Sequence, residues 1–168
     1  MPRKLALDET ALKKVLKRQE AVISRTQALL LGLTDRAIRR RVEPGGPWQR
    51  LLPGVYLTET GRATPDQLQI AALLYAGSPS MLTGTTALQR LGVRVPSRDM
   101  MVVLVPAEKQ HRSARYVTIW PTTRWPDECM AQGVIRFALP DRAAADAARE
   151  LTSDRDIRAV IADAAQKR

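Results

Sequence analysis

The sequence predicts an α+β protein in two domains, and three observations support this assignment. Residues 24–42, SRTQALLLGLTDRAIRRRV, contain two short helical patterns joined by a glycine turn. Two β-prone runs that flank a Pro-Gly pair follow directly, and further strand-like runs and two helical patterns come later. We therefore expect an N-terminal winged helix-turn-helix over residues 1–62. A small α+β domain with a short antiparallel sheet and C-terminal helices should follow over residues 63–168.

Capping residues place the two helices of residues 24–42. Ser24 can cap the first helix, and Gly32 follows its last leucine, where a left-handed residue is least costly as glycine. Thr34 can cap the second helix, with Asp35 in its first turn. The buried side of the first helix is predicted to consist of Ala28, Leu29, Leu30 and Leu31. This order is typical of a helix-turn-helix, whose second helix enters the DNA major groove.

The two sides of the second helix differ in charge. At 100° per residue, Ile38 and Val42 share an apolar side. The opposite side, roughly 100–200° away, carries Arg36, Arg39 and Arg40, with Glu43 among them. A merely solvated helix face is the alternative, but such a face usually mixes in more acidic residues. We therefore expect these three arginines to face the major groove of DNA.

The charge of the whole chain agrees with an acidic partner. The 168 residues carry a net charge of +10, and the isoelectric point is about 10.6. Residues 1–62 hold 13 lysines and arginines against 6 acidic residues, whereas residues 140–168 hold 6 of each. Aromatic residues make up only 4% of the chain, which leaves few rings for stacking on single-stranded bases. Double-stranded DNA is therefore the expected partner.

A hairpin is predicted directly after the second helix. The run EPGGP at residues 43–47 must end that helix, and WQRLLPGVYLT follows it. Pro-Gly favours a type II turn, which fits a tight hairpin poorly, so we expect a bulge or a longer loop. Arg50 and Arg62 are the expected phosphate contacts, and Thr34 and Arg41 should meet the rim of the groove. The loop at residues 58–64 is the expected domain boundary.

The remaining elements follow from local patterns. In the first domain we expect a helix over residues 8–19 and a minimal strand at residues 21–23. In the second domain, the run at residues 100–105 should pair antiparallel with residues 115–120. The other elements expected there are a helix from Thr64, strands at 81–83 and 134–138, and helices over 85–91, over 140–151 and after Ser153.

Patterns of catalysis or metal binding were not found. His111 is the only histidine and Cys129 the only cysteine, so neither a zinc site nor a Ser-His-Asp arrangement is expected. The sequence also lacks a glycine-rich phosphate loop. We therefore expect no enzyme activity, no cofactor and no metal. Without a signal-peptide pattern or a long apolar run, the expected location is cytoplasmic, at the nucleoid when DNA is bound, with no membrane partner.

The N-terminal motifs resemble a known family. SRTQALLLGLTDRAIRRRV followed by WQRLLPGVY is similar to the winged helix-turn-helix domain of AbiEi-like antitoxins, from type IV abortive-infection toxin–antitoxin systems. The resemblance continues through the helix at residues 64–77 and through the helical stretch from residue 138 to the terminus. Longer relatives carry an additional nuclease-like domain, which the resemblance does not extend to. The family's members bind inverted repeats at their own promoter.

The resemblance implies a bacterial transcriptional repressor of its own operon, with two copies bound to inverted repeats. Residues 63–168 would then protect against a toxin, orient a second copy, or both. The alternative is a protein-interaction module that uses the winged helix together with an apolar patch at Trp120 and Trp125. Which of the arginines reads a base is left open by the sequence, as are the operator, the toxin and the oligomeric state.

Overall fold

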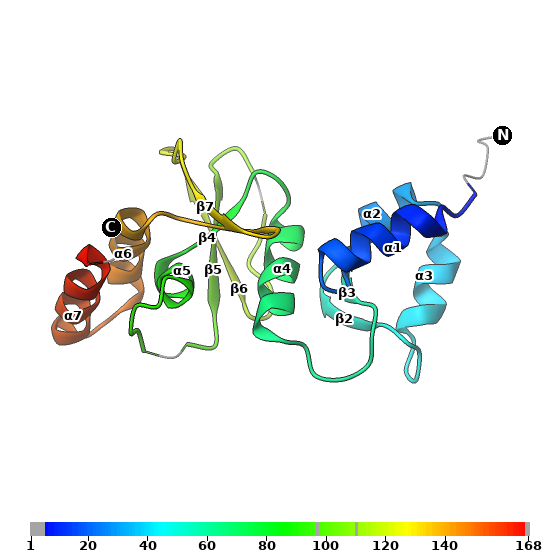
Figure 1. Cartoon of the computed structure of the whole chain (residues 1–168), viewed down its shortest axis with the longest axis horizontal. Helices are drawn as coiled ribbons and strands as arrows, with labels where there is room; N and C mark the ends of the chain where they lie inside the picture. The colour runs from blue at the N-terminus through cyan, green and yellow to red at the C-terminus, as the bar shows by residue number, and fades with distance from the viewer. Residues whose placement is uncertain (1–5, 97, 110, 167–168) are drawn as a thin grey trace. The chain divides into compact units, whose positions relative to one another are not determined.

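The computed structural model describes residues 6–96, 98–109 and 111–166. The chain divides into two compact units, residues 1–75 and residues 76–168. Within the described residues the architecture is mixed α+β, with seven helices, a three-stranded antiparallel sheet and a five-stranded mixed sheet (Figure 1). The predicted α+β class is therefore confirmed. No helix in these ranges is long and apolar enough to cross a membrane.

The first unit contains four helices and three strands, with α4 ending one residue beyond its boundary. The elements are α1 (Glu9–Arg18), β1 (Val22–Ser24), α2 (Arg25–Leu30), α3 (Asp35–Val42), β2 (Gln49–Leu52), β3 (Val55–Leu57) and α4 (Pro65–Ala76). Strand β3 lies in the middle of the sheet and pairs antiparallel with both β1 and β2. The order of helix, strand, helix, helix and hairpin agrees with the sequence analysis.

Side-chain caps begin each of the first three helices. Asp8 accepts from the backbone N–H of Ala11, Ser24 from that of Gln27, and Thr34 from that of Ala37. The Gln27 side chain also accepts from the Ser24 backbone N–H, which completes a capping box. These caps set the start of α2 and of α3 where the sequence predicted them.

Gly32 makes the tight turn between α2 and α3. Its φ of +92° is in the left-handed region. A Cβ atom there would lie 2.4 Å from the backbone oxygen of Ala6 and 2.9 Å from the Cα of Leu7. The position therefore requires glycine for two reasons, the backbone conformation and the close passage of the N-terminal segment.

The core of the first unit joins its helices to its sheet. Ile23, Ala28, Leu33, Ile38, Trp48 and Tyr56 form one buried cluster, with Leu12, Val15 and Leu16 of α1 packed against it. The prediction that Leu30 is buried was wrong, because this side chain is 71% exposed. Leu30 follows the fully buried Ala28 by two residues, which is about 200° around a helix. Four successive residues cannot all share one face.

The hairpin of β2 and β3 contains the expected irregularity. The register shifts between Arg50 and Leu52, so β2 carries a bulge or similar distortion. Gly54 takes a φ of +70° in the turn. A Pro-Gly turn therefore closes this short hairpin with a local break in pairing, as the turn type predicted.

Helix α4 belongs with the first unit in the compact division, whereas the sequence analysis placed the boundary at residues 62 and 63. Gln67 near the start of α4 contributes to this attachment. Its amide donates to the backbone oxygen of Glu20 at 3.0 Å and to the Glu59 carboxylate at 2.6 Å. Side-chain bonds between distant residues leave no periodic signal in the sequence.

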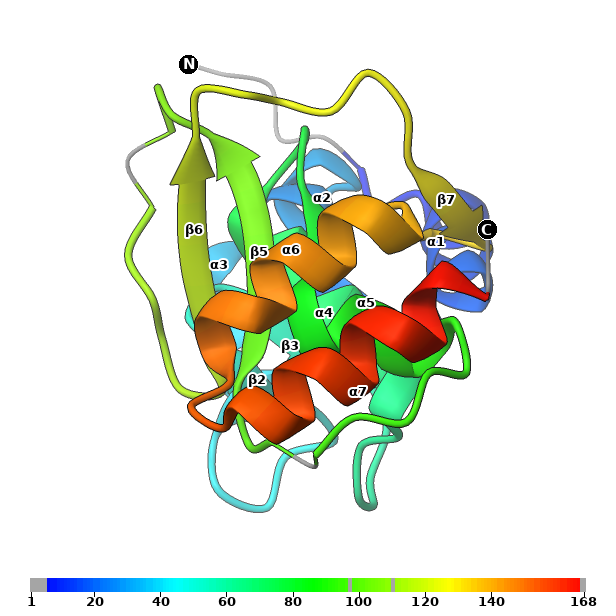
Figure 2. The same cartoon turned by 90° about the vertical axis from the view of Figure 1, so that its left-hand side faces the viewer.

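The second unit is built on a five-stranded sheet in the order β6-β5-β4-β8-β7. Its elements are β4 (Met81–Thr83), α5 (Gly84–Arg90), β5 (Met101–Pro106), β6 (Val117–Thr122), β7 (Met130–Gln132), β8 (Ile135–Phe137), α6 (Pro140–Glu150) and α7 (Asp154–Ala165). Helix α6 packs on α5 and on β4, and α7 packs on α6 (Figure 2). The two C-terminal helices begin and end close to their predicted bounds.

The predicted antiparallel pairing of β5 with β6 was wrong, because the two strands are parallel. The connecting loop reverses direction twice. It turns once just after β5, where the Lys109 N–H donates to the Pro106 oxygen, and again where Ala114 and Val117 exchange two backbone hydrogen bonds. Two reversals restore the original direction, so the sheet is mixed and not a short antiparallel one as expected. Strand β7 was also missed, since all three of its residues are exposed.

Candidate nucleic-acid interface

Helix α3 is held to the core by one side, which determines what its other side can contact. Ile38 is only 2% exposed and belongs to the core cluster, and Leu33 just before the helix is buried beside it. Thr34 caps the helix, so the hydroxyl that was predicted to meet the groove rim accepts from the Ala37 N–H. The side opposite Ile38 therefore faces away from the core.

Three arginines occupy that outward side. Arg36, Arg39 and Arg40 are all exposed. Within the described part of the chain, their side chains make no ion pair or hydrogen bond. Three neighbouring guanidiniums raise a local positive potential and offer paired donors that match phosphates or guanine edges. The structure thus brings together the three arginines that the helical pattern placed on one face.

Arg41 behaves differently from these three arginines. Its Nη1 donates to the Ala37 backbone oxygen at 3.0 Å, and its guanidinium lies 5.6 Å from the centre of the Trp48 ring. The side chain is half-buried. Arg41 therefore covers the core cluster at Trp48, a role that the sequence analysis did not consider when it placed Arg41 at the groove rim. The tryptophan seven residues later was the available signal.

The two other predicted phosphate contacts lie on different segments. Arg50 is exposed on β2, in the register opposite Tyr56. Arg62 is exposed in the loop after β3. The amide of Gln49 anchors that loop, because it donates to the backbone oxygens of Glu59 at 2.9 Å and of Gly61 at 2.7 Å. Arg62 is thus attached to a loop with a fixed connection to β2.

Arg25 is a charged residue of this surface that the sequence analysis missed. Its backbone N–H donates to the Gly54 oxygen in the hairpin turn at 2.7 Å. Its guanidinium Nη2 lies 2.6 Å from Oδ1 of Asp35 in the first turn of α3. Arg25 therefore connects α2, the hairpin turn and α3. The only signal in the sequence was its place directly after the Ser24 cap.

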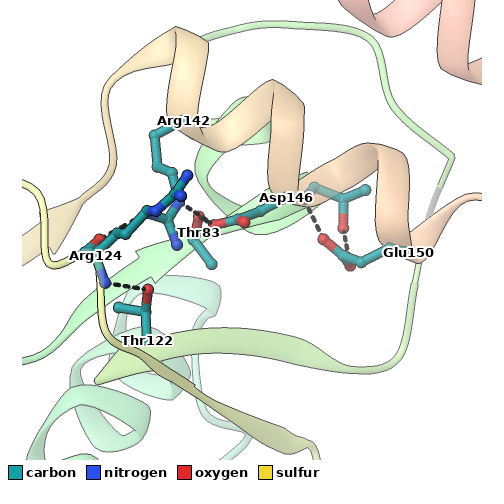
Figure 3. A network of polar contacts seen from close by, with 7 residues as sticks. Thr83, Thr122, Arg124, Arg142, Asp146 and Glu150 are labelled. Atoms are coloured by element: carbon teal, nitrogen blue, oxygen red, sulfur yellow. Dashed lines mark hydrogen bonds and ion pairs between the residues drawn. The ribbon is translucent and has the colours of Figure 1, made fainter. Parts of the chain in front are cut away.

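The second unit holds a polar network between α5, β4 and α6, drawn in Figure 3. The hydroxyl of Thr83 donates to the Asp146 carboxylate at 2.6 Å, and Arg142 donates to the same oxygen atom at 2.8 Å. Glu150 accepts from the Thr85 backbone N–H at 2.7 Å and from its hydroxyl at 2.8 Å. Among the described residues, no buried side-chain nitrogen or oxygen lacks a partner. The network therefore connects helices and is fully satisfied.

Glu150 is the acidic group of this network with a shifted titration. Burial raises its pKa above the usual 4.5 because the charged form loses water, and the Asp146 charge acts in the same direction. The hydrogen bonds from Thr85 and the charge of Arg98 oppose this shift without cancelling it. The carboxylate is also packed onto Gly84, where any side chain would collide with it.

The tryptophans proposed as a partner surface are half-buried. The Arg149 guanidinium lies 4.3 Å from the centre of the Trp120 ring and covers one face of it. Trp125 is also half-buried. Neither side chain is among the large hydrophobic residues with high exposure. The Trp120 ring is therefore in contact with Arg149 of the same unit.

Residues with metal-binding or nucleophilic chemistry are scattered. Across the described ranges, no three histidine, cysteine, aspartate or glutamate residues come together in a group that could hold a metal ion. His111 and Cys129 are both exposed and lie on separate loops. By contrast, the positively charged residues Arg36, Arg39 and Arg40 lie together on the outward side of α3.

No protein-family model matches the sequence, and no curated protein is significantly similar to it.

Proposed function

We propose that residues 1–62 form a winged helix-turn-helix that binds double-stranded DNA. Helix α3 acts as the recognition helix in the major groove, and the hairpin of β2 and β3 acts as the wing. Arg36, Arg39 and Arg40 face the groove. Arg50 and Arg62 contact the phosphates that flank it. Such a domain acts by binding DNA, which requires no catalytic residue.

One observation carries this proposal. The three outward arginines of α3 are exposed, and no described residue neutralises them, while Ile38 secures the opposite side of the same helix in the core. Asp35 lies four residues before Arg39, and Glu43 lies three residues after Arg40. Among the described residues neither acid forms an ion pair with these arginines, although a merely solvated helix would favour such pairs. The net charge of +7 over residues 1–62 acts in the same direction, since it attracts a polyanion.

The direct test is a binding titration at two salt concentrations. Each phosphate contact adds about 0.9 to the slope of log K against log salt on duplex DNA. With several arginines at the interface, duplex affinity should fall steeply with salt, and single strands should bind more weakly. Fluorescence anisotropy of labelled duplex and single strand measures both. An affinity that does not change with salt would contradict the proposal.

We further propose that the protein represses its own operon in the manner of AbiEi-like antitoxins. The support is the resemblance of SRTQALLLGLTDRAIRRRV and WQRLLPGVY to that family, together with the exposed arginines on α3. Two copies on inverted repeats would place their half-sites about one helical turn apart on the duplex. The second unit would then protect against a toxin, orient a second copy, or both.

Footprinting upstream of the gene tests this role. The expected result is a protected region long enough for two copies, with two half-sites of inverted sequence. A promoter reporter should be repressed by the wild-type protein and released by the Arg36→Ala variant. A protected region long enough for one copy only, or no protection near the promoter, would contradict autoregulation. The proposal of DNA binding would still stand.

A further inference from the structure

The ion pair of Arg25 and Asp35 lies between two elements of the proposed DNA surface. The Arg25 backbone is bonded to the hairpin turn at Gly54, and its guanidinium reaches Asp35 at the start of α3. Both side chains remain about half exposed, at 49% and 48%. Exposed ion pairs contribute little to the free energy of folding, so this pair adds little to the stability of the first unit.

Asp35 is not required to start the helix that it belongs to. Thr34 already caps α3 through the Ala37 N–H. Asp35 is also the only acidic residue within α3, where it precedes Arg36, Arg39 and Arg40. On a surface that approaches DNA, a carboxylate repels phosphates and competes with them for any guanidinium in reach.

We propose that Asp35 holds the Arg25 guanidinium away from DNA phosphates and so lowers the sequence-independent affinity of this surface. This inference rests on the proposed DNA binding. In a helix-turn-helix the helix before the recognition helix crosses the DNA backbone, and Arg25 is the first residue of that helix, α2. Without its carboxylate partner, the guanidinium can form one more contact to a phosphate.

The experiment measures binding of the full chain to a random-sequence duplex between 50 mM and 200 mM salt. Asp35→Asn should bind more tightly than the wild type at low salt. One additional phosphate contact steepens the salt slope by about 0.9, so the ratio of mutant to wild-type association constants should fall about 3-fold across this range. If Asp35 served only the helix dipole, the same change would weaken α3 and lower the affinity.

Combining variants separates release of Arg25 from simple loss of a negative charge. In the Arg25→Ala background, Asp35→Asn should not steepen the slope, because no guanidinium remains to be released. Glu9→Gln is the matched control, since Glu9 is also an acid in the first turn of a helix in the same unit. It should leave the slope unchanged. Asp35→Glu keeps the charge and should bind as the wild type does.

The outcomes can be distinguished. A steeper slope in Asp35→Asn that disappears in the Arg25→Ala background supports the inference. An unchanged slope in a folded Asp35→Asn variant, or an equal change in both backgrounds, overturns it while DNA binding stands. A wild-type protein that binds no duplex overturns both. Thermal melting monitors folding, and Asp35→Ser replaces Asp35→Asn if the latter unfolds.

Discussion

The arginines of α3 differ in their contacts although they look alike in the sequence. Arg36, Arg39 and Arg40 project from the side opposite Ile38, whereas Arg41 bends back over Trp48. A difference of one position is 100° around a helix, which is enough to move a guanidinium from an outward face to the edge of the core. Mutational effects should therefore differ among neighbours.

Substitution of these arginines should separate base reading from phosphate binding. Arg36→Ala or Arg40→Ala should lower the affinity for the cognate site more than for random DNA, by ~1–3 kcal/mol if the lost contact is to a base. Arg50→Ala should weaken both about equally, because a phosphate carries no sequence information. Anisotropy titrations with both duplexes measure the difference. Equal losses at all three positions would mean that α3 does not read the sequence.

At the scale of elements, the turn between α2 and α3 depends on close packing as well as on backbone conformation. Gly32 and Gly45 both have a positive φ, at +92° and +81°. A Cβ at Gly32 would collide with the backbone of Ala6 and Leu7, whereas a Cβ at Gly45 would meet nothing within 4 Å. An alanine at Gly45 would therefore cost only backbone strain, whereas an alanine at Gly32 would cost the same strain and a steric overlap as well.

Gly32→Ala should destabilise the first unit more than Gly45→Ala. The shared cost of a left-handed alanine is roughly 1 kcal/mol, and the overlap at Gly32 should raise the total to roughly 2–3 kcal/mol. Chemical denaturation of the full chain with Trp120 and Trp125 replaced by Phe, followed by the fluorescence of Trp48 in the first unit, measures both changes. Equal losses would show that the N-terminal segment moves aside without cost.

The contact between α5 and α6 should make the second unit sensitive to pH through Glu150. Its pKa is raised in the folded state, so folding favours the protonated form. The stabilisation from this group is fully present below the usual pKa of 4.5 and is lost as the pH rises through the raised value. The wild type should therefore lose stability relative to Glu150→Gln across that window.

Denaturation curves of the wild type and of Glu150→Gln at several pH values test this. The variant removes the titrating group, so the difference between the two free energies of unfolding isolates Glu150 from the other acids. The Asp141→Asn variant is a suitable control, because Asp141 is an exposed acid on the same helix. A difference that grows in favour of the wild type as the pH rises would contradict the expected sign.

At the scale of the whole molecule, the first unit should fold without the second. Its core cluster is formed entirely by residues within 1–62, and it joins α1, α2 and α3 to the sheet. Helix α4 adds the two bonds donated by Gln67, one of them to a carboxylate. Helix α4 also carries the buried residues Ile70, Ala71 and Ala72, so the two fragments differ in a whole helix.

Two fragments test this division. Residues 1–62 should melt cooperatively but with low stability, because small domains bury a limited surface. Residues 1–75 should be more stable by at least ~1–3 kcal/mol, the contribution of the two Gln67 hydrogen bonds, of which one is charge-assisted. Calorimetry or circular dichroism gives both transitions. Absence of a cooperative transition in the shorter fragment, together with its presence in the longer one, would make α4 essential to the first unit.

The sequence by itself determined the helices, their caps and the charged face of α3. Caps at Ser24 and Thr34, the turn at Gly32 and the spacing of Ile38 from the three arginines are all local, within one or two helical turns. Local patterns survive in a single sequence because each residue acts on neighbours that are only a few positions away. The candidate interface was therefore largely predictable before its geometry was known.

Only the tertiary structure decided which strands pair and which charges are engaged. The parallel pairing of β5 with β6, the bond from Gln67 to the Glu20 backbone and the pair of Arg25 with Asp35 join residues that are ten or more positions apart. The contact of Arg41 with Trp48, seven residues later, is likewise not indicated by the helical pattern. Such contacts depend on the conformations of the connecting loops. Neither hydrophobic periodicity nor composition predicts these conformations.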